Sequence, residues 1–184
     1  FAIGALNAQA PPFTLDEVAY HLAVPKTWAL EGRAVELPLI SHSYFPLGIE
    51  SASLPAFALL GDAAGYAAHW LHFFAALAAA VLLYALLRER VAPELAVAVT
   101  AAAVTIPPLA VTTGWAWLEW PLVGVALVAY AAMERFADGD DDALPTIGVA
   151  LAAGLLTKYT FGAFAIAAPA ATWVAVSRER RRAP

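Results

Sequence analysis

Long uncharged stretches alternate with short charged clusters along the chain after residue 62. Residues 63 to 87 contain no Asp, Glu, Lys or Arg, and they lie between Asp62, a predicted helix N-cap, and the cluster Arg88-Glu89-Arg90. A helix needs about 20 residues to cross the roughly 30 Å hydrocarbon core of a bilayer. This stretch therefore predicts a membrane-spanning helix.

The next uncharged stretch, from Leu95 to Leu118, contains the pair Pro107-Pro108. Proline lacks a backbone N–H donor, so the pair predicts a bend or an early end of this helix. A further helix is expected from residue 115, where two tryptophans match the aromatic belt of a membrane interface, to residue 133. Glu119 then lies at the interface, within reach of water.

The last apolar stretch runs from Ala143 to Ser177 and is interrupted only by Lys158. A single helix of that length would reach about 50 Å, well beyond a bilayer. We therefore expect two short helices that fold back on each other between Thr157 and Gly162.

This hairpin brings the charged segments 88–94, 134–142 and 178–184 to one side of the membrane. The side carries most of the arginines, namely Arg88, Arg90, Arg135, Arg178, Arg180, Arg181 and Arg182. The positive-inside rule makes it the cytoplasmic side. Residues 7 to 62 are then expected on the outer side.

We expect one membrane domain over residues 1–184, all-α, a polytopic membrane helical bundle. Residues 1–10 are interpreted as the end of a truncated transmembrane helix. Residues 11–62 are predicted to form a long outer loop that carries interfacial amphipathic helices. Residues 63–184 are predicted to contain about five transmembrane helices.

Composition supports the membrane class and narrows the chemistry. Hydrophobic residues make up 62% of the chain and charged residues 14%, whereas soluble domains run near half and a quarter. Cysteine is absent, which excludes disulfides and thiolate metal sites. A net charge of -5 and scattered basic clusters exclude the basic face that nucleic-acid binding needs.

The outer loop is rich in aromatic and aliphatic residues, so it is expected to be ordered and functional. Thr14 to Glu17 fits a capping box, which predicts a helix that starts at Thr14, bends before Pro25 and stops at Gly32. A second interfacial helix is expected to begin at Pro46 and to break at Pro55.

The adjacent acids Asp16 and Glu17 admit two interpretations. In a capping box Glu17 reaches back to the helix start, which is a structural role, and Asp16 in the first turn favours the helix dipole. Catalytic carboxylates also gather on loops held over a cleft. Given the membrane context, we favour catalysis for Asp16 and keep Glu17 as a second catalytic residue.

Four short motifs, in this order, resemble the GT-C glycosyltransferases, in particular bacterial enzymes of the protein O-mannosyltransferase and aminoarabinose transferase type. They are Asp16-Glu17-x-x-Tyr20, Glu31-Gly32, Tyr44-Phe45-Pro46 and Thr157-Lys158-Tyr159-Thr160. The resemblance covers nearly the whole chain and corresponds to the N-terminal portion of such an enzyme.

The resemblance implies an inverting transfer of a sugar from a polyprenyl-phosphate carrier to a hydroxyl of a lipid, glycan or protein acceptor. It implies a multi-pass protein of the bacterial inner membrane, with its site on the periplasmic or extracellular side. The acid of the first outer loop is the general base in that family, a role that falls on Asp16. No cofactor other than the lipid-linked donor is expected, because such a donor needs a cation near its phosphate more than a metal.

Lys158 is the predicted phosphate-binding cation, and Tyr159 shares that role. A lysine at this depth is costly unless it is paired, which suggests function; snorkelling to ordinary lipid phosphates is the alternative. Tyr20, His21 and His42 are predicted to contact the substrate.

His69 and His72, three residues apart on one helix, have the spacing of two metal ligands. No carboxylate accompanies them on that helix face, so we predict no metal site. Glu50 and Glu119 are the remaining outer carboxylates, and either is an alternative to Asp16 as the base.

A fragment of a transporter, or a non-catalytic membrane protein, is the rival interpretation. Transporters also use proline-broken helices and isolated charges such as Lys158. However, they concentrate charge at mid-membrane in paired repeats, whereas the acids here lie in the predicted outer loop and no inverted repeat is visible.

Overall fold

A computed structural model describes the backbone of residues 1–182 and the side chains of residues 1–176. Within this part of the chain 78% of the residues are helical and no strand is present, which confirms the all-α prediction. Among the described residues, three helical stretches are long and apolar enough to cross a membrane: Gly48–Arg88, Glu119–Ala137 and Tyr159–Val176.

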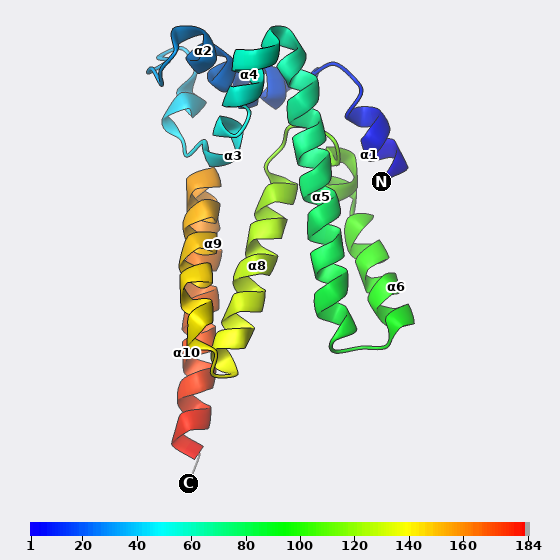
Figure 1. The fold of residues 1–184 in the computed structure, drawn as a ribbon, viewed down its shortest axis with the longest axis vertical. Helices are drawn as coiled ribbons and strands as arrows, with labels where there is room; N and C mark the ends of the chain where they lie inside the picture. The colour runs from blue at the N-terminus through cyan, green and yellow to red at the C-terminus, as the bar shows by residue number, and fades with distance from the viewer. Residues whose placement is uncertain (183–184) are drawn as a thin grey trace.

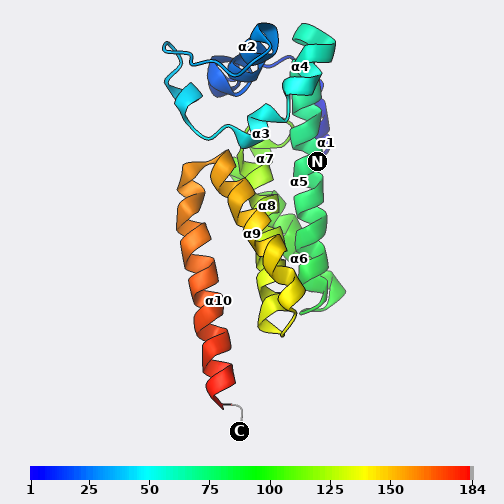
Figure 2. The ribbon, with the colours of Figure 1, turned by 60° about the vertical axis from the view of Figure 1, so that its left-hand side comes forward.

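The long helices α5 (Ala64–Arg88), α8 (Glu119–Ala137), α9 (Leu144–Thr157) and α10 (Gly162–Arg182) run along the long axis of the molecule (Figure 1). The central helix α8 packs against both α5 and α9. Small residues dominate the α8–α9 contact, where Ala129 and Ala132 meet Ala143 and Ala150. Such residues let helix backbones approach closely inside a bilayer. Figure 2 shows α10 beside α9 and away from α5.

The proline pair ends a helix, as predicted. Helix α6 (Pro93–Val104) stops two residues before the pair, and the short helix α7 (Pro107–Thr112) starts on it. Proline suits the first turn of a helix, where the backbone N–H has no intrahelical partner. Helices α6 and α9, with 12 and 14 residues, are apolar but shorter than a full span, so the expected total of about five spans stays a prediction.

The last apolar stretch folds back at the predicted place. Helix α9 ends at Thr157, Lys158 is extended with φ −153°, and a 3₁₀ turn over Tyr159–Phe161 leads into α10. Gly154 makes the tight turn possible, because a β-carbon there would overlap the ring of Phe161. The hairpin prediction is therefore confirmed.

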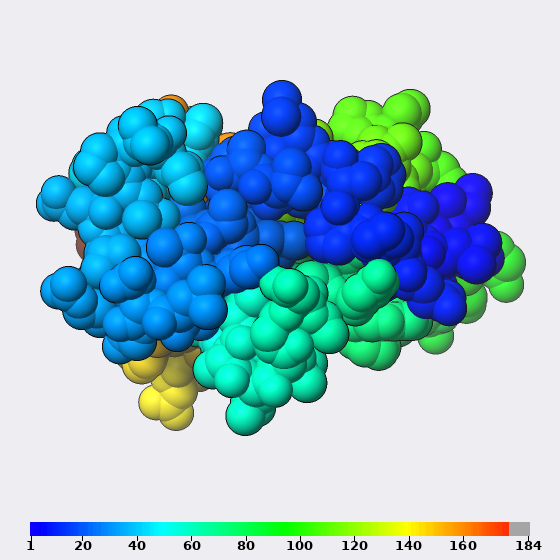
Figure 3. Space-filling view, turned by 90° about the horizontal axis from the view of Figure 1, so that it is seen from above, coloured from blue at the N-terminus to red at the C-terminus, as the bar shows by residue number. Residues whose placement is uncertain are grey.

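Residues 14–63 form a cap over one end of the bundle (Figures 1 and 3). The cap contains a π-helical turn, Glu17–His21, and the helices α2 (Ala23–Glu31), α3 (Gly48–Ser51) and α4 (Leu54–Leu60). The short helix α1 (Ala2–Asn7) lies beside it, against α5 and α7. Leu22 and Phe57 of the cap pack on Ala64 and Ala68 of α5.

The arginine-bearing links lie at the opposite end from the cap (Figure 1). Arg88 ends α5, Arg90 pairs with Glu134, and Arg135 pairs with Asp140. Helix α10 runs to the same end, as the hairpin requires. Four more arginines were predicted on this side, at positions 178 and 180–182. The structure does not describe their side chains.

Three local predictions in the cap are wrong. Helix α3 begins at Gly48 rather than at Pro46, and Pro55 lies in the first turn of α4 instead of breaking a helix. Asp62 is not the N-cap of α5, which begins after Ala63 without a side-chain cap. The Asp62 carboxylate instead pairs with Lys26, Oδ1 to Nζ 2.6 Å.

Candidate functional site

One half of the predicted capping box forms at the start of the cap, where the Glu17 side chain reaches back to Thr14. The backbone N–H of Thr14 and its hydroxyl both donate to Glu17 Oε2, at 3.2 and 2.7 Å. The chain then enters the π-helical turn, closed by a bond from the Leu22 N–H to the Glu17 carbonyl. Such turns occur frequently at functional sites. Here Glu17 and His21 are buried, whereas Asp16 and Tyr20 are half-buried.

Glu17 is fully buried and joins the cap to the bundle. Its Oε1 accepts from His69 Nε2 on α5 at 2.8 Å and from the backbone N–H of Ala116 at 2.7 Å. Burial raises the pKa of Glu17, but hydrogen bonds from His69, Thr14 and Ala116 outweigh it and lower the pKa to about 2. The carboxylate is therefore an ionised structural anchor, and its catalytic role stays a prediction.

The two histidines of α5 form hydrogen bonds with different partners. His69 donates to Glu17, and His72 Nδ1 donates to the Ala68 carbonyl at 2.8 Å. The expectation that no carboxylate accompanies them holds for their own helix, yet the cap supplies Glu17 from 52 residues away. Among the residues that the structure describes, no group of three or more His, Cys, Asp or Glu side chains is arranged to hold a metal ion.

A pocket of about 150 Å³ lies where the cap meets the ends of α8 and α9. Its wall contains four of the predicted site residues together with neighbours from the cap, the start of α8 and the end of α9: Tyr20, His42, Phe45, Pro46, Leu47, Glu50, Leu118, Thr157, Lys158 and Tyr159. The predicted substrate contacts Tyr20, His42, Lys158 and Tyr159 are thus brought together from segments more than a hundred residues apart.

Four aromatic rings follow one another along this pocket. Tyr20 stacks on His42 with ring centroids 4.2 Å apart, His42 meets Phe45 edge to face at 5.1 Å, and Phe45 meets Tyr159 edge to face at 5.5 Å. Phe45 was not predicted as a site residue, although it belongs to the Tyr44-Phe45-Pro46 motif. Aromatic faces and edges prefer these offset geometries.

His21 is not part of the pocket wall. Its Nδ1 donates to Glu50 Oε1 at 2.8 Å, and both side chains are buried, with 4% and 2% exposed. His21 thus reaches the pocket through Glu50. This pairing was not predicted, because the two residues lie 29 positions apart and share no sequence signal.

Asp16 lies near the pocket rather than in its wall. Burial first, and then the charges of Asp16, Glu50 and Glu119, raise the pKa of Tyr20 to about 12. Three carboxylates therefore lie near enough to this tyrosine for their charges to disfavour its ionised form. The Asp16 carboxylate makes no hydrogen bond to any residue that the structure describes, so its oxygens are free to act on another group.

Lys158 has one acidic neighbour. Its Nζ lies 3.8 Å from Glu119 Oε1, and the two side chains are 42% and 32% exposed. The distance exceeds that of a hydrogen bond. Within the described residues the ammonium donates no hydrogen bond, so its donors are available to a ligand at the pocket.

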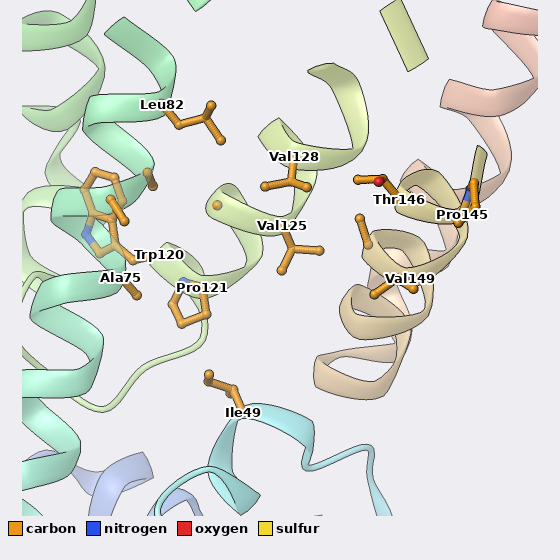
Figure 4. A pocket seen from close by; sticks show the side chains of 14 residues that line it. Ile49, Ala75, Leu82, Trp120, Pro121, Val125, Val128, Pro145, Thr146 and Val149 are labelled. Carbon is orange, nitrogen blue, oxygen red and sulfur yellow. The ribbon is translucent and has the colours of Figure 1, made fainter. Parts of the chain in front are cut away.

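A second, larger cavity of about 600 Å³ runs between α5, α8 and α9 (Figure 4). Its walls are almost wholly apolar, with Leu82 from α5, Trp120 and Val125 from α8, and Val149 from α9. Ile49 of α3 closes it on the cap side, next in sequence to Glu50 of the smaller pocket. No sequence pattern predicted this cavity.

Residues 53–183 match the profile of the family described as dolichyl-phosphate-mannose-protein mannosyltransferase. The matched part includes α4 to α10 with Glu119, Lys158 and Tyr159, and it leaves out Asp16 and Tyr20. No curated protein and no solved structure matches the chain.

Proposed function

The chain belongs to the dolichyl-phosphate-mannose-protein mannosyltransferase family, and from that premise we propose that it binds a polyprenyl-phosphate sugar and transfers the sugar to an acceptor hydroxyl. The family is of the GT-C type and implies glycosyltransferase activity. The donor, the acceptor and the membrane face are parts of the proposal.

The position of Lys158 is the observation that carries the proposal. Its ammonium has free donors and lies in a pocket wall lined by aromatic rings, at the turn between two apolar helices. Ammonium groups bind phosphate through charge-assisted hydrogen bonds. The apolar cavity along α8 and α9 is suited to the carrier chain of such a phosphate, with the headgroup at Lys158.

Asp16 supplies the general base in this mechanism. The acceptor oxygen attacks the anomeric carbon of the sugar and gives its proton to the Asp16 carboxylate. The bond between that carbon and the phosphate oxygen breaks, and its electron pair leaves with the carrier phosphate. Lys158 stabilises this anion, and attack opposite to the leaving group inverts the anomeric centre.

The charge distribution supports a site on the outer face. The cap and the end of α9, which Lys158 follows, lie at one end of the bundle, whereas the ends of α5 and α8, with Arg88 and Arg135, lie at the other (Figure 1). The positive-inside rule assigns the arginine end to the cytoplasm. In a bacterial inner membrane the pocket then opens on the periplasmic side. A lysine at the end of the bundle, rather than at its middle, also favours an enzyme over a transporter.

A transfer assay tests the function. The full-length protein that contains this chain is reconstituted in vesicles and offered a panel of polyprenyl-phosphate sugars together with lipid, glycan and protein acceptors. We expect transfer from at least one donor with inversion at the anomeric carbon. No transfer from any donor in the panel, by protein that is folded and inserted, would overturn the proposal.

A further inference from the structure

Glu50, a residue of the pocket wall, has one oxygen without a hydrogen-bond partner among the described residues. One oxygen, Oε1, accepts the bond from His21, whereas Oε2 is buried and has no hydrogen-bond partner among the described residues. The side chain is 2% exposed, yet Glu50 belongs to the pocket wall. A buried acceptor without a partner is costly and rare in folded proteins.

Glu17, the other buried carboxylate of the cap, has hydrogen-bond partners on both of its oxygens. Glu17 accepts four hydrogen bonds, two on each oxygen. Glu50 accepts one from a side chain of the protein. Glu17 therefore has a full set of hydrogen bonds, whereas Glu50 is held in place by His21 and has one of its two oxygens without a partner among the described residues.

The residues around Glu50 indicate which kind of hydrogen-bond donor suits its free oxygen. The same wall carries the rings of Phe45 and Tyr159, which suit the apolar face of a sugar, and the cation Lys158. A second cation in so small a pocket would be repelled by that ammonium. A neutral O–H donor on a sugar ring satisfies the free acceptor without this conflict.

We infer that Glu50 is a specificity-determining residue, whose free oxygen accepts a hydrogen bond from a ring hydroxyl of the transferred sugar. The inference rests on the proposed function, because it assigns a role within the same donor site. His21 acts as a positioning residue that fixes the Glu50 carboxylate through the bond at Oε1.

Such a site discriminates sharply against a donor that lacks the hydroxyl. A buried group left unpaired by an analogue makes hydrogen-bonding sites far more selective than apolar ones. Among monodeoxy analogues of polyprenyl-phosphate mannose, we expect one position whose removal lowers kcat/KM by about a hundredfold or more. Removal of hydroxyls that point to solvent is expected to have a small effect.

The variant Glu50→Gln isolates this role. Glutamine keeps the size of the side chain, and its carbonyl oxygen still accepts from His21, while an amide NH₂ replaces the free acceptor. We expect kcat/KM for the intact donor to fall about ten- to a hundredfold, and the penalty for the sensitive deoxy position to shrink to a few-fold. Glu36→Gln, an exposed position in the same cap, is the matched control.

Binding of the same donors in nanodiscs, measured by calorimetry, separates the two proposals. Transfer by the wild type with unchanged discrimination in Glu50→Gln would overturn the role of Glu50 and leave the proposed function intact. Failure of transfer, combined with donor binding that depends on Glu50 and on one hydroxyl, would overturn the function and support the sugar site. Wild-type protein that binds all deoxy donors equally would overturn the inference. Equal unfolding temperatures of the two Gln variants show that the effect is local.

Discussion

Glu17 and His69 meet at 2.8 Å across the junction between the cap and α5, and both side chains are fully buried. The same Glu17 oxygen accepts the N–H of Ala116, 99 residues away in the link to α8. One carboxylate therefore holds three parts of the chain together. Its neighbour Asp16 is half-buried and directly precedes the same π-helical turn, so the Glu17 anchor also fixes the position of Asp16.

Replacement of Glu17 is expected to destabilise the protein. Glu17→Ala leaves His69 and the Ala116 N–H without their acceptor in a buried site, and the loss of one partner of such a pair costs about 3–5 kcal/mol. Glu17→Gln keeps an acceptor and should cost less. Thermal unfolding in detergent, followed by circular dichroism, measures both. A Glu17→Ala protein as stable as the wild type would contradict the anchoring role.

The low pKa of Glu17 makes this contribution pH-dependent. A carboxyl group with a lowered pKa in the folded state stabilises that state above its ordinary value, 4.5 here, and the stabilisation is lost as the pH falls towards about 2. We expect the stability difference between wild type and Glu17→Gln to be largest above pH 4.5 and to shrink between pH 4.5 and 2. A difference that stays constant across that range would show that Glu17 is not ionised.

Asp16→Asn is expected to abolish transfer without unfolding the protein. An amide cannot take the acceptor proton, and a positioned base contributes about 10²- to 10⁴-fold to the rate. Because the Asp16 carboxylate has no hydrogen bond to the described residues, its loss should leave the unfolding temperature unchanged. Substitutions of the two adjacent acids should therefore have different effects: Asp16 variants should lower kcat, and Glu17 variants should lower stability. Wild-type kcat in Asp16→Asn would move the base to Glu50 or Glu119.

Lys158→Ala is expected to weaken donor binding. Loss of a charge-assisted contact to phosphate costs about 1.5–3 kcal/mol, which raises KM for the donor about ten- to a hundredfold. Glu119→Gln is the informative comparison, because it removes the anion 3.8 Å from the ammonium and should leave KM unchanged or lower. Transfer kinetics at varied donor concentration measure both. An unchanged KM in Lys158→Ala would refute the phosphate role.

The sequence predicted correctly those helix ends that depend on residues adjacent in the chain. Thr14 and Gly32 bound a helical segment because a cap and a left-handed glycine, φ 66°, act on the backbone beside them. The N-cap prediction for Asp62 is wrong because the helical turn begins earlier: Asp62 lies inside the 3₁₀ turn Gly61–Ala63 that leads into α5, and its carboxylate pairs with Lys26. The pairs Glu17–His69 and His21–Glu50 arise from packing between distant segments, which no periodicity encodes. For the same reason Lys158, Tyr159, Tyr20 and His42 could be assigned to one substrate site from their motifs, whereas the places of Phe45 and Glu50 in its wall could not be predicted.

The hairpin that presents Lys158 depends on one glycine, and this can be tested. A β-carbon at Gly154 would overlap the buried ring of Phe161, so Gly154→Ala must push the turn apart at a cost of about 1–3 kcal/mol. Because Lys158 and Tyr159 lie between these two residues, donor KM should rise as stability falls. Gly148→Ala is the matched control, since a β-carbon there meets open space in the same helix. The double variant Gly154→Ala/Phe161→Leu should recover much of both losses, and a coupling energy near zero in this cycle would contradict the proposed contact.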